Sequence, residues 1–438
     1  MRKHKLFILL LWTLIVVGLA ACSGTENSSN DTIADPDSED EELEPVTIRI
    51  MSRGPFNDDE RFQEYYVEPL AKVYPHITLE RVPGGIGDLE DMILAQETPD
   101  IIAPWNGDFA LLMGMELMQD LHPYVEELGS DLERFEPETL DSATINGALY
   151  GLPYAQQFEA LYYNKDIFDL FGVPYPKDGM TWNDTIELAT VVSREESGTN
   201  YRGLHPHMFA RLLNPFGLGS FADFETNESI VSARKDDLKV ALETWDAIAK
   251  IPGNLPEDIN DLNNMDYGEQ EFFEGTLAML PAVNIINYLP EELNWGVVQY
   301  PQFEQVPNTY GAIDAHYHVL TTVSQNPTDA FRVMDFFASP EFQERMTREL
   351  GLFTVMKDPE IKTAFASENP IISEMDFSGV FKSTAAESPI LHEIRLELRG
   401  IAGAKAVQMI EDGRDVNTII SEIEQEVDVA IKEYESRQ

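Results

Sequence analysis

The sequence predicts an α/β protein with two lobes, and three observations lead to this prediction. The chain has 438 residues, which is enough for two domains that each bury a full core. Short apolar runs typical of buried strands alternate with segments in which apolar residues recur at helical spacing. One central stretch, residues 147–182, joins two such series of elements. Alternation of this kind indicates sheets covered by helices.

The N-terminal segment is expected to lie outside the fold. Three basic residues within the first five positions precede an apolar run, Leu6 to Val17, which is the pattern of a signal peptide over residues 1–21. Small residues stand directly before Cys22, as in the lipobox of bacterial lipoproteins, and this resemblance implies that Cys22 is acylated. The alternative is an ordinary signal peptide followed by a stray cysteine. Because Cys22 is the single cysteine, no intrachain disulfide can form.

Residues 22–45 are expected to form a disordered acidic tether, because they combine few apolar residues with many like charges. The whole chain has 30 Lys and Arg against 78 Asp and Glu, a formal net charge of −48. This charge argues against nucleic acid as a partner and against a second, electrostatic contact with anionic lipid. One explanation is an alkaline or saline exterior, in which the charge maintains solubility.

The first lobe is expected to begin with a strand over Val46 to Met51. A helix over Asp59 to Tyr74 and a strand over Ile77 to Val82 follow, and a helix after a strand, repeated, indicates βαβ units and a mainly parallel sheet. The loop after the first strand contains Arg53. Loops at the carboxyl ends of such strands meet ligands, so Arg53 is a candidate contact, with a plain surface charge as the alternative.

A second pair of candidates follows the apolar strand that ends at Pro104. Trp105 and Asp108 come directly after it. An indole face and a carboxylate together suit a ligand with both an apolar face and hydroxyl groups. The alternative is a tryptophan in the core and an aspartate that caps a helix over Phe109 to Met118.

The central stretch contains two apolar runs that predict buried strands, Leu149 to Pro153 and Ala160 to Tyr163. Aromatic and amide side chains between them could meet a polar ligand: Tyr154, Gln156, Gln157 and Phe158. A short helix over Asn164 to Phe171 follows. The next helix, Trp182 to Val192, is preceded by a nominal capping box.

The second lobe offers two further ligand candidates. Phe216 lies in a loop rich in glycine and aromatic residues and is a possible stacking ring, with core packing as the alternative. Apolar residues recur at helical spacing from Leu238 to Ala249, which predicts a helix that buries Trp245 in the hydrophobic core. Asn284 follows a buried strand and is a candidate hydroxyl partner.

Asp314, His316 and His318 alternate, so on a strand they would share one face. A metal site is one interpretation of this spacing, and ligand contact or simple packing is the other. The sequence offers no cysteine ligand here, and the other His-x-His pair, His205 and His207, lies far along the chain. Ligand contact or simple packing is therefore favoured over a metal site, and we expect neither a metal nor a cofactor. Helices are predicted beyond it over Thr328 to Phe337, over Glu341 to Leu350, and along the C-terminal segment from Val416.

Several weak motifs, in one order, resemble the family 1 extracellular solute-binding proteins, the sugar-capturing subunits of ABC importers. The similar segments are PDI at 99–101, LMQDLHPY at 117–124, YYNKD at 162–166, FFEGTLAML at 272–280 and WGVVQYP at 295–301. The resemblance runs from about Val46 to the C-terminus. The chain departs from the family at Asn284, near which relatives often have an aromatic residue, and at Thr354, where relatives have a proline.

The resemblance implies a two-lobed, periplasmic-binding-protein-like fold (type II) with mixed sheets flanked by helices and a ligand cleft between the lobes. It places the N-lobe at 46–153 plus about 310–357 and the C-lobe at about 158–305 plus about 358–438, with crossings near 153–158 and 300–315. The expected ligand contacts are Trp105 and Phe216 as stacking faces, Asp108, Gln157 and Asn284 as hydroxyl partners, Asp314 and Arg53 as further contacts, and Tyr154, Gln156 and His316 at the rim.

The expected function is that of a monomeric binding protein, lipid-anchored on the outer face of a Gram-positive cell membrane, which delivers a mono- or oligosaccharide to an ABC permease. A free amino acid would need paired Arg and Asp, and Arg53 is the one good basic candidate. A lipid-anchored glycoside hydrolase and a sensor module without a transporter are the alternatives. The sequence has no G-x-S-x-G elbow, P-loop or H-E-x-x-H motif, which argues against an enzyme.

Overall fold

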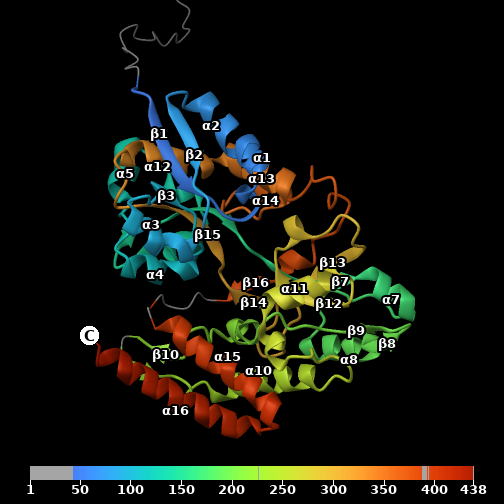
Figure 1. The fold of residues 1–438 in the computed structure, drawn as a ribbon. Helices are drawn as coiled ribbons and strands as arrows, with labels where there is room; N and C mark the ends of the chain where they lie inside the picture. Colours follow the sequence, from blue (N-terminus) through green and yellow to red (C-terminus); the bar gives the residue numbers. More distant parts are fainter. Residues whose placement is uncertain (1–42, 225, 387–391, 393, 438) are drawn as a thin grey trace, which may run out of the picture. The chain divides into compact units, whose positions relative to one another are not determined.

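The fold is described from a computed structural model, in which residues 43–224, 226–386, 392 and 394–437 are described (Figure 1). The predicted signal peptide, Cys22 and nearly all of the predicted tether lie outside these residues. Residues 44–438 form one compact unit. Its elements are arranged around two sheets, and we call the parts built on them the first and the second lobe.

The first lobe is built on a five-stranded sheet with the order β2-β1-β3-β15-β6. Its strands are β1 (Val46–Met51), β2 (Ile77–Arg81), β3 (Ile101–Ile102), β15 (Ala315–Leu320) and β6 (Leu152–Gln156). The pairs β1/β2 and β1/β3 are parallel, whereas β15 runs antiparallel to both β3 and β6. The sheet is therefore mixed rather than mainly parallel, because β15 returns from the second lobe in the opposite direction.

The first helical segment of this lobe shows a local effect of proline. The expected helix over 59–74 is present as α1 (Asp59–Phe62), a π-helical turn (Gln63–Val67) and α2 (Glu68–Val73). Pro69 has no N–H and its ring clashes with the carbonyl four residues earlier, so the turn before it widens. The remaining helices of this lobe are α3 (Leu89–Ala95), α4 (Phe109–Gly114), α5 (His122–Leu128), α6 (Pro137–Asp141), α12 (Pro327–Phe337), α13 (Pro340–Leu350) and α14 (Pro359–Thr363).

The second lobe is built on a three-stranded antiparallel sheet with the order β12-β7-β13. The central strand β7 (Glu159–Asn164) is buried along its whole length, between β12 (Met279–Val283) and β13 (Trp295–Gln299). Its helices are α7 (Lys165–Phe171), α8 (Trp182–Val192), α9 (Phe209–Leu213), α10 (Lys235–Ala249), α11 (Met265–Phe273), α15 (Arg395–Asp412) and α16 (Val416–Glu435). The predicted capping box of α8 is confirmed.

Four short two-stranded ladders complete the sheet structure. They are β4 (Thr144–Ile145) with β5 (Ala148–Leu149), β8 (Arg194–Glu196) with β9 (Thr199–Tyr201), β10 (Ala222–Asp223) with β11 (Glu228–Ser229), and β14 (Thr309–Ala312) with β16 (Thr384–Ala386). The last ladder lies where the chain leaves the second sheet and approaches the first.

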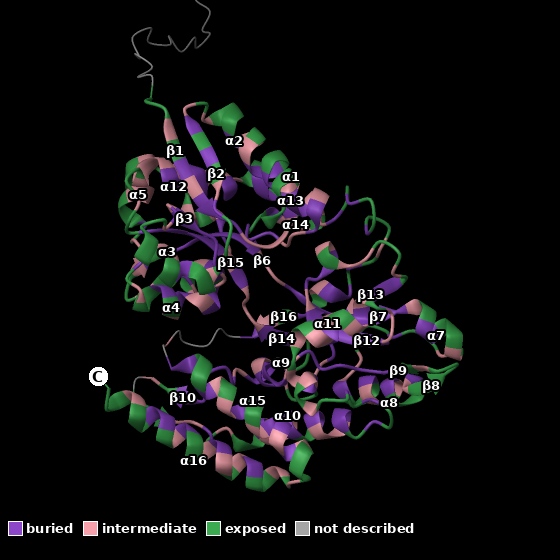
Figure 2. Cartoon of the chain, viewed as in Figure 1, coloured by how far each residue is buried: buried purple, intermediate pink, exposed green. Residues whose placement is uncertain are grey.

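Separate hydrophobic cores lie behind the two sheets. The first core draws on residues 48–155 and 315–361, and the second on residues 161–310 and 394–431. Trp245 lies in the second core as predicted, where its indole N–H donates to Ala406 O at 3.0 Å. The C-terminal helix α16 buries one apolar stripe and exposes its other face (Figure 2). A smaller third core draws on residues 158–297 and 366–380.

The chain changes from the first sheet to the second between Gln156 and Glu159, and it returns between Gln299 and Ala315. The two crossings touch each other, because Gln157 N–H donates to Asp314 O at 2.8 Å. The lobe boundaries expected from the sequence stay a prediction.

Candidate functional site

A small cavity has walls from both lobes, and we call it the cross-lobe cavity. Six of the ten predicted ligand residues line it: Arg53, Tyr154, Gln156, Gln157, Asn284 and His316. They come from the loop after β1, the end of β6, the loop after β12 and the start of β15. Gly54, Pro55, Phe56, Ala155, Asn287, Tyr288 and Leu352 complete the lining. Segments far apart in the sequence thus meet where several strands end.

The volume of the cross-lobe cavity is about 30 Å³. One water needs roughly 10–15 Å³ on this scale, and ligand sites typically offer roughly 300–1,000 Å³. The cavity therefore has room for about two or three waters in the described conformation. A sugar can occupy it only if the walls from the two lobes move apart.

Two asparagines tie the second lobe to the first at this cavity. Asn284 Nδ2 donates to Gly351 O at 2.8 Å, and Asn287 Nδ2 donates to Leu350 O at 2.9 Å. Both carbonyls lie at the C-terminal end of α13, where the last helical carbonyls lack intrahelical donors. The side-chain amide of Asn284 is thus engaged with the protein, and its predicted contact with a ligand hydroxyl stays a prediction. We call this pair the asparagine latch.

Asp108 fixes the loop after β3 to the loop after β1. Its Oδ2 accepts from Arg53 Nη1 at 3.0 Å and from Trp105 N–H at 3.3 Å. Burial raises the pKa of Asp108, although Arg53 and Trp105 oppose this effect. Its side chain does not cap α4 itself, but by accepting from Trp105 N–H it caps the short 3-10 turn (Asn106–Asp108) that leads into α4. The carboxylate lies next to Trp105, as predicted, but outside the lining of the cross-lobe cavity.

The indole of Trp105 is half-buried and packs over Gly107, where any Cβ would overlap the ring. Trp105 also forms an isolated antiparallel bridge with His316. The alternative of a fully buried core tryptophan does not apply. Whether the ring stacks on a ligand stays a prediction.

Asp314 and His316 lie together, with His316 Nε2 at 3.6 Å from Asp314 Oδ1. Burial alone would raise the pKa of Asp314, but His316 and two arginines, Arg211 and Arg53, hold it below its ordinary value. Gln157 Nε2 lies 3.4 Å from His316 Nε2. These three side chains form a polar group beside the crossings.

His318 belongs to the core instead. Its ring stacks on Tyr154 with centroids 4.3 Å apart, and its Nε2 lies 3.3 Å from Tyr66 Oη. A register shift between His316 and Tyr317 interrupts the pairing of β15, so the simple alternation predicted for a strand does not hold there. Among the described residues, no group of three or more His, Cys, Asp or Glu side chains could hold a metal ion.

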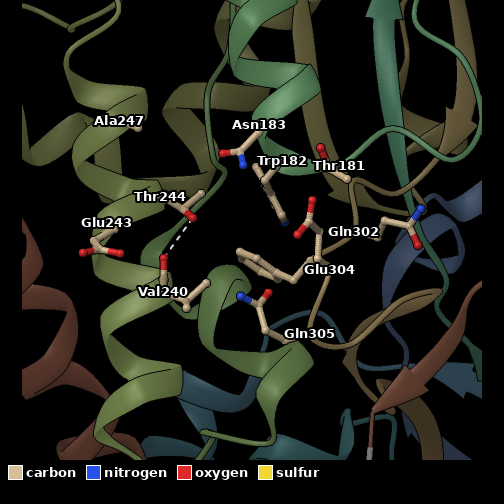
Figure 3. A pocket seen from close by; sticks show the side chains of 11 residues that line it. Thr181, Trp182, Asn183, Val240, Glu243, Thr244, Ala247, Gln302, Glu304 and Gln305 are labelled. Atoms are coloured by element: carbon tan, nitrogen blue, oxygen red, sulfur yellow. Dashed lines mark hydrogen bonds between the residues drawn. The ribbon is translucent and has the colours of Figure 1, made fainter.

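The structure does not bring Phe216 to the other predicted residues. Its ring packs against Phe303 with centroids 4.7 Å apart and is only 5% exposed. This geometry favours the alternative of core packing. Phe303 also lines a separate cavity of about 220 Å³, where the indole of Trp182 and Glu304 point inward between α8 and α10 (Figure 3). None of the ten predicted residues lines that cavity.

A larger cavity of about 720 Å³ adjoins Gln156. It includes five phenylalanines, Phe158, Phe353, Phe365, Phe377 and Phe381, with Glu136, Glu138 and Lys362 among its polar residues. Gln156 is the one predicted ligand residue in its lining. Its size would admit a sugar, so it has to be distinguished from the cross-lobe cavity by experiment.

Sequence reasoning missed a buried ion pair in the second lobe. Arg211 Nη1 lies 2.5 Å from Glu159 Oε1, and the two side chains are 12% and 2% exposed. Glu159 Oε2 also accepts from Gly311 N–H at 3.2 Å. The charge of Arg211 acts on Asp314 as well, so the pair extends the polar group into the second lobe. A lone glutamate at the start of an otherwise apolar strand was the available signal.

Comparison with known proteins gives the fold and the family. The family model described as "Bacterial extracellular solute-binding protein" matches residues 65–372. A binding protein of Brucella abortus (strain 2308) is 25% identical over 317 residues, which cover 67% of this chain and 73% of the relative.

Two solved structures share the fold. The ABC substrate-binding protein Lmo0181 of Listeria monocytogenes, solved with cycloalternan, is 17% identical, covers 89% of this chain and 99% of its own, and has a TM-score of 0.68. The sugar-binding protein MalE of Xanthomonas citri is 19% identical, covers 89% and 98%, and has a TM-score of 0.67. The predicted two-lobed α/β fold is confirmed.

The family model matches well over half of the chain, and it describes binding proteins rather than enzymes. Among the described residues, no helix combines the length and apolar character needed to cross a membrane. The chain belongs to the family of bacterial extracellular solute-binding proteins.

Proposed function

We propose that the chain captures a mono- or oligosaccharide between its lobes for an ABC importer. The observation that carries the proposal is the cross-lobe cavity, where amide, phenol, imidazole and guanidinium groups from both lobes meet. Neutral amides and aromatic rings suit a ligand with many hydroxyls and apolar C–H faces. The sugar-binding protein of Xanthomonas citri and the cycloalternan complex of the Listeria protein support this ligand class by analogy of fold.

The small volume of the cavity suggests how capture works. A sugar enters while the walls are apart, and a ligand that touches both lobes favours the closed arrangement by its differential affinity. No bond is made or broken. The lobes would be residues 46–153 plus about 310–357, and about 158–305 plus about 358–438.

Delivery at a membrane is part of the proposal. Acylation of Cys22 would hold the monomeric protein on the outer face of a Gram-positive cell membrane, where an ABC permease receives the ligand. The lipobox-like sequence before Cys22 supports the anchor. Cells expressing Cys22→Ser should release the protein into the medium and incorporate no labelled fatty acid into it. Retention of that variant in the membrane fraction would contradict the anchor.

A thermal-shift panel tests the ligand class. A ligand at 100 times its dissociation constant adds about 2.7 kcal/mol of stability, so a matching saccharide should raise the melting temperature. Gln157→Ala should reduce that shift, whereas Gln325→Ala, on the exposed surface of the first lobe, should leave it unchanged. Stabilisation by amino acids and by no saccharide would refute the proposal.

The same assay can tell whether the ligand binds in the 720 Å³ cavity or in the cross-lobe cavity. Phe381→Ala alters its wall and lies outside the cross-lobe cavity. If the ligand binds in the cross-lobe cavity, the affinity of Phe381→Ala should match the wild type. Loss of binding in Phe381→Ala together with full binding in Gln157→Ala would show that the ligand binds in the 720 Å³ cavity instead.

A further inference from the structure

Two arginines at the N-terminal end of α15 form no ion pair with any carboxylate of the described residues. Arg395 is the first residue of the helix, and Arg399 lies four positions later on the same face. Arg395 is only 7% exposed, and its Nε donates to Gly219 O at 3.3 Å. Of the described carboxylates, Asp314 acts electrostatically on Arg399 without forming an ion pair with it. We call these residues the α15 arginines.

Two effects disfavour the positive charges of the α15 arginines. A helix N-terminus carries the positive end of the helix dipole, which disfavours cations. Burial, together with the charge of Arg399, lowers the pKa of Arg395 to about 10. Burial and the charge of Arg211 likewise lower the pKa of Arg399.

The α15 arginines adjoin the polar group beside the crossings. Helix α15 packs against α9, which carries Arg211 (Figure 2). Arg399 interacts electrostatically with both Arg211 and Asp314. Asp314 Oδ1 and Arg211 Nε are buried and have no hydrogen-bond partner. Charged groups thus extend from Asp314, just before β15, through Arg211 on α9 to the first two turns of α15.

We propose that the α15 arginines bind an anionic oxygen group of the ligand, so that the captured solute is an acidic saccharide, such as one that contains a uronic acid. The inference rests on the proposed function. Guanidinium groups bind carboxylates and phosphates with two parallel hydrogen bonds, and the free N–H groups of a helix N-terminus favour an anion at the same place. The hydroxyls of the sugar would lie toward Asp314 and Gln157.

Calorimetric titration with matched saccharides tests the inference. Galacturonate and its oligomers are compared with galactose and its neutral oligomers, and glucose 6-phosphate is compared with glucose. The acidic member of a matching pair should bind about tenfold to a hundredfold more tightly, as expected for charged hydrogen bonds. Arg399→Gln should abolish this preference and leave the affinity for the neutral member unchanged.

A second measurement does not depend on knowing the sugar. Inorganic phosphate should raise the melting temperature of the wild type and have less effect on Arg399→Gln. The empty variant should be at least as thermostable as the wild type, because repulsion is relieved. Arg414→Gln is the matched control, since Arg414 follows the other end of α15 and pairs with Glu422. It should keep both the anion effect and the ligand preference.

The outcomes separate the two proposals. Equal affinity for neutral and acidic sugars, with an unchanged phosphate effect in Arg399→Gln, overturns the anionic site and leaves sugar capture standing. A phosphate effect that Arg399→Gln removes, without binding of any saccharide, supports the anionic site and refutes sugar capture. No response to phosphate and no preference for acidic sugars refutes the inference.

Discussion

The asparagine latch should control how often the lobes separate, and the double variant Asn284→Ala/Asn287→Ala tests this. Each amide donates one hydrogen bond to a carbonyl at the end of α13 in the other lobe, at 2.8 and 2.9 Å. A hydrogen bond of this kind contributes about 0.5–1.5 kcal/mol net. Losing both should disfavour the described conformation by about 1–3 kcal/mol, a factor of about 5 to 150 in population.

Distance measurements between spin labels can read this population directly. With Cys22 replaced, labels at introduced cysteines can be placed at Lys72 on α2 and Glu187 on α8, both exposed and in different lobes. The double variant should show a larger share of long distances than the wild type. Asn200→Ala, an exposed asparagine of the second lobe, is the control and should change nothing. An unchanged distance distribution in the double variant would show that the latch does not hold the lobes.

Three further predictions concern buried groups. Glu159→Gln should remove the ion-pair partner of the buried Arg211 guanidinium and reduce the free energy of unfolding by about 3–5 kcal/mol. Glu159→Gln/Arg211→Met should recover most of this lost free energy in urea titrations, and a loss below about 1 kcal/mol in the single variant would refute the prediction. Burial lowers the pKa of His318 to about 3. Because the unfolded side chain takes up a proton near pH 6.5, stability is lost as the pH falls below that value, and the wild type should lose about 2 kcal/mol more than His318→Gln between pH 7 and pH 5; parallel curves would contradict this. Gly107→Ala should displace the neighbouring indole, alter its fluorescence and weaken ligand binding, whereas Gly87→Ala, with nothing within 4 Å of the added methyl, should be neutral; identical behaviour of the two variants would count against packing of the indole on Gly107.

Elements set by local signals could be predicted closely from the sequence. The strand over Val46–Met51 has the predicted bounds, and α8 begins and ends at the predicted residues because its capping box and apolar spacing are local. The helix expected over 109–118 ends at Gly114, and a π-helical turn replaces part of the helix before Pro69. The direction of β15 depends on the route of the chain through the other lobe, which no local pattern encodes.

The candidate site was predictable where it follows strand ends. Arg53 and Asp108 come after two neighbouring strands of one sheet, which brings Arg53 Nη1 to 3.0 Å from Asp108 Oδ2. Phe216 was harder to place, because a flexible-looking loop gave no sign that Phe303 would cover its ring. Arg211 lies on a short helix, and only the packing of α9 brings it to Glu159. Such pairings between distant segments cannot be read from spacing alone.

The contact between the two crossings gives Gln157 a special place in the energetics of capture. Its backbone N–H is bonded to Asp314 O, so it lies at the pivot about which the lobes would turn. A side chain at a pivot has almost no lever arm, and it can hold a ligand equally well whether the lobes are apart or together. Its contribution would be uniform affinity without bias toward closure. Residues far from the pivot sweep through the largest arc, and only they can convert binding into movement of the lobes.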